Sequence, residues 1–134
     1  MIDVYVDQIM TEDLVTVSGS LTLAAAGETM TDADIKSVVV SDAEDRPVGI
    51  LTSTDFVRMA ADGNSPAESR VSEYMTADIV TTTPGAAVDE AADLMVDHGI
   101  SHLPVVGDDG RLTGIVTTTD VAVYVSGLDD FLPS

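Results

Sequence analysis

The pattern of apolar and polar residues changes period several times along the chain and predicts a mixed α/β fold. In the first half, a short β-branched run precedes a stretch in which apolar residues recur at helical spacing. Two apolar runs then flank an Asp-rich turn, and a second helix follows. The predicted elements are a leading helix at 6–10, a strand at 14–17, a helix at 21–30, strands at 38–40 and 48–51, and a helix from about Ser53.

The second half of the chain repeats this order without a gap. Met10-Thr11 recurs 65 positions later (75 − 10) as Met75-Thr76, and the heptapeptide 49–55 recurs as 114–120. The matching elements are a leading helix at 71–75, a strand at 79–81, a helix at 87–96, strands at 103–106 and 114–116, and a helix from about Thr118. A Gly-, Asn-, Ser- and Pro-rich linker at 61–69 separates the halves. We therefore expect one repeat at 1–63 and a second at 64–134.

The repeated heptapeptide Gly-Ile-aliphatic-Thr-x-x-Asp resembles the signature of the CBS domain, which is named after cystathionine β-synthase. Both copies carry it, from Gly49 to Asp55 and from Gly114 to Asp120. Two copies in tandem resemble a Bateman module, and the resemblance covers nearly the whole chain. It implies two β-α-β-β-α repeats packed with pseudo-twofold symmetry, two ligand clefts between their sheets, and a homodimer formed through the helices.

The resemblance also implies a ligand that contains adenosine, such as AMP, ATP or S-adenosylmethionine. Asp55 and Asp120 would bind the ribose hydroxyls, and Thr52 and Thr117 would lie near the phosphates. The strand residues that would enclose the adenine are Thr16, Val17, Val38, Val39, Thr81, Thr82, Leu103 and Pro104.

Physical chemistry supports two interpretations of this motif. A carboxylate accepts two hydrogen bonds side by side, which suits a vicinal diol, and a helix N-terminus favours an anion. Gly49 and Gly114 would let a ligand or another backbone segment approach closely. Alternatively, Thr-x-x-Asp is a capping box, worth about 1 kcal/mol, that needs no ligand.

The charge balance narrows the choice of partners. Twenty-four acidic residues against five basic ones give a formal net charge of −19, which disfavours nucleic acid and anionic membranes. This acidic surface resembles that of proteins from salt-loving archaea. The same charge favours AMP or S-adenosylmethionine over ATP, although in molar salt the Debye length falls to about 3 Å and only direct contacts matter.

Few cations are available to meet a phosphate. Lys36 begins the strand that pairs backwards with 48–51, so it should lie near Thr52, and His102 takes a similar place in the second copy. Arg58 is a third candidate, although ordinary surface charge is the favoured interpretation of both Lys36 and Arg58. Arg46 and Arg111 are expected to be solvated hairpin residues, roughly 15–20 Å from the motif threonines.

Other classes of function lack support. The chain has no Cys, no nucleophile elbow and no phosphate-binding Gly-rich loop, so we expect no catalytic residues. His98 and His102 have a metal-like spacing, but Gly99 and Ile100 end the helix between them, so we expect no metal site. Without a signal peptide or an apolar run of about 20 residues, the expected location is the cytoplasm.

The sequence therefore predicts a regulatory module that is not an enzyme and carries no resident cofactor. It would bind an adenosine ligand and signal to a partner that the sequence does not identify. The alternative is a ligand-free dimerisation or protein-interaction module, in which the motif aspartates act only as helix caps.

Overall fold

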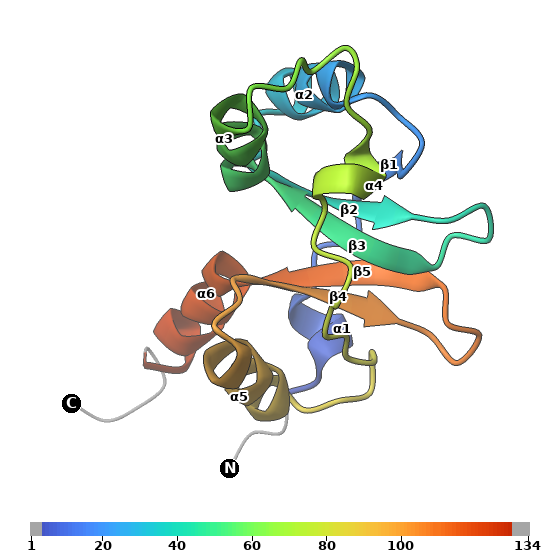
Figure 1. The fold of residues 1–134 in the computed structure, drawn as a ribbon. Helices are drawn as coiled ribbons and strands as arrows, with labels where there is room; N and C mark the ends of the chain where they lie inside the picture. Colours follow the sequence, from blue (N-terminus) through green and yellow to red (C-terminus); the bar gives the residue numbers. More distant parts are fainter. Residues whose placement is uncertain (1–3, 130–134) are drawn as a thin grey trace. The chain divides into compact units, whose positions relative to one another are not determined.

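The computed structural model describes residues 4–129, and its elements follow the predicted order in both halves, except that the second half has no strand between its first two helices (Figure 1). The elements are α1 (Val6–Ile9), β1 (Thr16–Ser18), α2 (Leu23–Ala33), β2 (Ser37–Ser41), β3 (Pro47–Thr52), α3 (Ser53–Ala61), α4 (Val71–Tyr74), α5 (Val88–His98), β4 (His102–Val106), β5 (Leu112–Thr117) and α6 (Thr118–Asp129). The mixed α/β class and the two repeats are confirmed.

The chain divides into two compact units whose borders differ from the sequence repeats. A continuous unit spans Val15–Ile79, and a composite unit joins the segment that ends at Leu14 to the segment from Val80 onward. Helix α4 belongs to the continuous unit and α1 to the composite unit. Each unit therefore contains the leading helix of the other sequence repeat.

The continuous unit is built on a three-stranded sheet in the order β1-β2-β3. Strand β1 runs parallel to β2, with Thr16 opposite Val39, and β2 runs antiparallel to β3, with Val38 opposite Leu51. Alternate residues of the strands face the helices and join one apolar core. Its buried members are Val17, Leu23, Ala26, Met30, Val38, Val40, Leu51, Met59, Val71 and Tyr74.

The composite unit has a two-stranded sheet, β4-β5, and a core of Val6, Ala91, Met95, Leu103, Val105 and Val116. The strand predicted at 79–81 is wrong, because only Thr82 bridges to Val105 here. Pro104 stands where the continuous unit has Val39, and it has no N–H to donate toward the neighbouring segment. Pro84, two residues after Thr82, also lacks an N–H, so the ladder does not extend in that direction.

Helices α2 and α5 run two or three residues beyond their predicted ends. Each ends at a residue in the left-handed region, Asp34 with φ 55° and Gly99 with φ 63°. At both ends the cap N–H donates to carbonyls of the last turn, which satisfies groups that would otherwise lack partners. His98 is the last residue of α5. Within 4–129, no helix has the length and apolar character needed to cross a bilayer.

Candidate functional site

Both copies of the Thr-x-x-Asp motif lie where a buried strand passes directly into a helix. Thr52 ends β3 and is the N-cap of α3, and Thr117 ends β5 just before α6. The start of the preceding hairpin strand fixes each junction: Ser53 N–H donates to Lys36 O at 3.0 Å, and Thr118 N–H donates to Ser101 O at 3.1 Å. The motif therefore holds its Asp at a helix N-terminus in both units.

The motif glycines are needed for close packing of the Met-Thr segments. A Cβ on Gly49 would lie 2.6 Å from Met75 Sδ and 3.0 Å from Thr76 O. A Cβ on Gly114 would lie 2.6 Å from Met10 Sδ and 3.1 Å from the carbonyl of the next residue. Of the two expected reasons for these glycines, the structure shows the approach of another backbone segment.

In the continuous unit, Asp55 is buried and fully engaged, with 4% of its surface exposed. Its Oδ2 accepts from Thr52 N–H at 2.8 Å and from the Thr52 hydroxyl at 3.3 Å. Its Oδ1 pairs with Arg58 Nη2 at 3.1 Å. Arg58, which was considered for a phosphate, instead holds the motif carboxylate.

In the composite unit, Asp120 keeps the cap but has different neighbours. Its Oδ2 accepts from Thr117 N–H at 3.0 Å, and its own N–H donates to Thr117 Oγ1 at 3.2 Å. The Thr11 hydroxyl lies 3.3 and 3.4 Å from the two carboxylate oxygens. Asp120 is partly exposed, and within residues 4–129 no cation pairs with it.

The candidate phosphate partners lie beside these junctions. Lys36 is exposed, and the next residue, Ser37, is paired with Thr52 across the hairpin. His102 is paired with Thr117 in the same way, and its Nδ1 lies 2.9 Å from Ser101 Oγ. Burial lowers the pKa of His102 below its usual range because it disfavours the imidazolium.

The strand residues expected around an adenine fall into three groups. The side chains of Val17, Val38 and Leu103 belong to the two cores, so only their backbone is free to meet a ligand. Val39 and Pro104 are buried residues that alternate with core residues along their strands and so face away from the cores. Of the remaining residues, Thr16 and Thr81 are exposed and Thr82 is buried.

The other charged candidates are accounted for locally. Arg46 pairs with Asp42 and Glu44 in the β2–β3 turn, and Arg111 lies near Asp109 in the β4–β5 turn, where both arginines are exposed. The Arg46 N–H donates to Asp42 and is the main reason that the pKa of that carboxyl is lowered. No cluster of metal-ligating side chains occurs in the described part of the chain.

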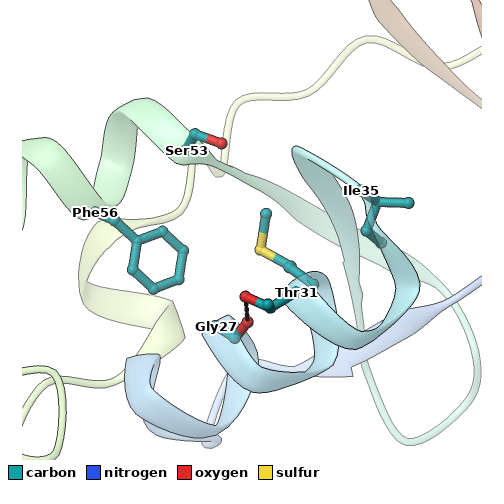
Figure 2. A pocket seen from close by; sticks show the side chains of 6 residues that line it. Gly27, Thr31, Ile35, Ser53 and Phe56 are labelled. Carbon is teal, nitrogen blue, oxygen red and sulfur yellow. Dashed lines mark hydrogen bonds between the residues drawn. The ribbon is translucent and has the colours of Figure 1, made fainter.

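A pocket of about 220 Å³ lies between α2 and α3 of the continuous unit (Figure 2). Gly27 leaves room for the Phe56 ring, which a Cβ there would meet at 3.3 Å, and Ser53 and Ile35 also line the pocket. The pocket is lined by neither Thr52 nor Asp55, so it is separate from the motif.

Sequence reasoning missed three features around the motif acids: Thr11 beside Asp120, the pairing of Arg58 with Asp55, and the contact of Arg58 with Tyr74. An alignment of the two copies at the 65-residue offset could have indicated this difference, because Val123 is equivalent to Arg58 and Ile9 is equivalent to Tyr74. The two copies share the motif and differ in what surrounds it.

The CBS-domain family model matches residues 6–62 and 71–127. The chain therefore belongs to the CBS-domain proteins and is a tandem CBS pair, or Bateman module.

Relatives of this chain include both small proteins and enzymes. It is 38% identical over 117 residues to an uncharacterized 17.7 kDa protein of Acidianus ambivalens, covering 87% of this chain and 70% of that protein. A second uncharacterized protein, from Methanopyrus kandleri, is 36% identical, and the match covers 90% of this chain and 62% of the relative. An inosine-5′-monophosphate dehydrogenase of Nitrosopumilus maritimus is 31% identical, and the match covers 84% of this chain but 22% of the enzyme.

Among solved structures, the CBS domain pair of protein MJ0100 superposes with a TM-score of 0.85 at 27% identity. The match covers 95% of this chain and 99% of that one. That pair was solved in complex with 5′-methylthioadenosine and S-adenosyl-L-methionine.

Proposed function

We propose that this chain is a non-catalytic regulatory module that binds an adenosine-containing ligand through a Thr-x-x-Asp motif and signals to a partner protein. The observation that carries the proposal is a carboxylate held at a helix N-terminus in each unit, beside a Thr and a possible phosphate partner. The structural similarity to a CBS pair that binds two adenosine compounds supports the same ligand class.

The charge of the chain favours the less anionic members of that class. The net charge of −19 repels a nucleotide at low salt, and one cationic or titratable side chain, Lys36 or His102, lies beside each motif. AMP, or S-adenosylmethionine with its sulfonium, therefore suits the site better than ATP.

Isothermal titration calorimetry of the whole chain tests the proposal. AMP, ADP, ATP and S-adenosylmethionine would be titrated in about 2 M KCl, where screening leaves only direct contacts. We expect AMP or S-adenosylmethionine to bind more tightly than ATP. Tighter ATP binding would refute the charge argument, and no binding of any of the four by folded protein would refute the ligand proposal.

A second candidate, a ligand-free dimerisation module, is favoured by two observations. The capping boxes satisfy the motif groups internally, and apolar side chains are exposed on the helices, with Val57 at 67%, Val96 at 79% and Val123 at 67%. Thermal unfolding separates the two functions, because a ligand that binds only the native state raises the unfolding temperature. A homodimer in sedimentation analysis with no such shift would favour the second function.

A further inference from the structure

We infer that the two motif aspartates have different roles: Asp120 accepts the ribose diol of the ligand, whereas Asp55 is a structural carboxylate held by Arg58. This inference rests on the proposed function and specifies which of the two motifs binds. It follows from the different surroundings of two otherwise equivalent side chains.

Both oxygens of the buried Asp55 carboxylate already have donors. One oxygen accepts from Thr52 N–H at 2.8 Å, and the other pairs with the Arg58 guanidinium at 3.1 Å. Charge-assisted bonds of this kind are roughly twice as strong as neutral ones. A ribose would have to displace the guanidinium from a carboxylate that is 4% exposed.

Arg58 has further partners besides Asp55, while 54% of its side chain is exposed. Its Nη2 donates to Tyr74 O at 2.6 Å, and its guanidinium lies 5.7 Å from the centre of the Tyr74 ring. The Tyr74 hydroxyl donates to Asp62 at 3.1 Å and accepts from Asn64 at 2.6 Å. This Arg58–Tyr74 clamp joins α3 to α4 and uses Asp55 as its third partner.

Asp120 has a replaceable partner where Asp55 has a cation. The Thr11 hydroxyl lies 3.3 and 3.4 Å from the carboxylate oxygens, beyond the 2.5–3.0 Å typical of hydroxyl donors. At the positions equivalent to Arg58 and Tyr74 stand Val123 and Ile9, which cannot form a clamp. Two ribose hydroxyls can therefore take the place of one weak contact.

Calorimetry with AMP, S-adenosylmethionine and 2′-deoxy-AMP tests the assignment on the whole chain. Wild type should prefer AMP to 2′-deoxy-AMP, because a site built for a hydroxyl rejects the analogue that lacks it. Asp120→Asn should weaken AMP binding at least about tenfold and abolish that preference. Asp55→Asn should keep the preference for AMP while lowering the unfolding temperature.

A second variant recreates the Arg58 arrangement at the other motif. Val123→Arg places a guanidinium three residues after Asp120, at a position that is 67% exposed and so tolerates the change. We expect AMP affinity to fall at least about fivefold because the arginine competes for the carboxylate. Val125→Arg adds the same charge on α6, at a position that is 45% exposed, and should not lower AMP affinity.

The outcomes separate the inference from the proposed function. Loss of binding in Asp55→Asn with retention in Asp120→Asn would overturn the inference alone. Unchanged AMP affinity in Val123→Arg, with binding by wild type intact, would also overturn it. No binding of AMP or S-adenosylmethionine by folded wild type would overturn the proposed function, and the inference with it.

Discussion

The two CBS repeats build the same helix cap and then surround it with opposite chemistry. In the continuous unit a polar network of Arg58, Tyr74 and Asp55 ties α3 to α4. In the composite unit the equivalent positions hold Val123 and Ile9, and besides the cap N–H of Thr117 the acid there meets the Thr11 hydroxyl. A motif shared by both repeats therefore fixes where an Asp lies, while the residues one helical turn away decide what that Asp can bind.

The same division between shared frame and variable surroundings extends to the hairpins. Ser37 faces Thr52 in one unit, and His102 faces Thr117 in the other. Val39 completes a parallel ladder, whereas Pro104 interrupts it. These two hairpin differences place a titratable side chain and an interrupted ladder in the composite unit, which is where we place the ligand.

The largest effect is expected from substitution of the motif glycines, which both repeats share. Gly49→Ala and Gly114→Ala should each destabilise the protein by about 2–3 kcal/mol, because the new Cβ would lie 2.6 Å from a Met sulfur and about 3 Å from a carbonyl oxygen. Chemical denaturation monitored by circular dichroism measures the loss. Gly85→Ala is the control, since a Cβ there would meet no atom within 4 Å. Equal stability of all three variants would show that the Met-Thr segments do not need the glycines.

A smaller effect tests the difference between the units. Arg58→Val gives the continuous unit the residue of the composite unit and should cost about 1–2 kcal/mol, because Asp55 stays buried without its cation. Arg46→Val removes an exposed ion-paired arginine from a turn and should cost less than about 0.5 kcal/mol. Both free energies of unfolding come from the same denaturation experiment. Equal costs would mean that the clamp is no more than a surface ion pair.

Most of the fold could be predicted because its signals are local and occur twice. The 65-residue repeat, the apolar strands and the Thr-x-x-Asp caps all lie in the sequence. The strand at 79–81 failed because the effect of Pro104 depends on a neighbour more than 20 residues away. The borders of the compact units could not be predicted either. Each leading helix packs in the unit of the other repeat, and an apolar pattern shows which face of a helix is buried but not what it packs against.

The backbone positions of the candidate site residues could be predicted from the sequence, but their side-chain contacts could not. The motif placed both acids, and the hairpin register placed Lys36 and His102 beside the motif threonines. The contacts of Arg58 with Asp55 and Tyr74 could not be predicted from the sequence. An arginine three residues after an Asp on a helix can also point to solvent. The part of the site that distinguishes the repeats is therefore the part that tertiary packing decides.

The smallest expected effect sharpens the comparison through pH. Burial lowers the pKa of His102 below 6.5, so the unfolded chain binds this proton more readily than the folded one. The stabilising effect of the neutral imidazole is present above pH 6.5 and is lost as the pH falls below it. His102→Ser, which copies Ser37 of the other repeat, should therefore lose less stability than wild type between pH 7.5 and 5.5. His98→Ser, at the exposed end of α5, is the control for removing a histidine, with thermal unfolding as the measurement. If His98→Ser flattens the profile and His102→Ser does not, the pH dependence does not come from the hairpin beside Asp120.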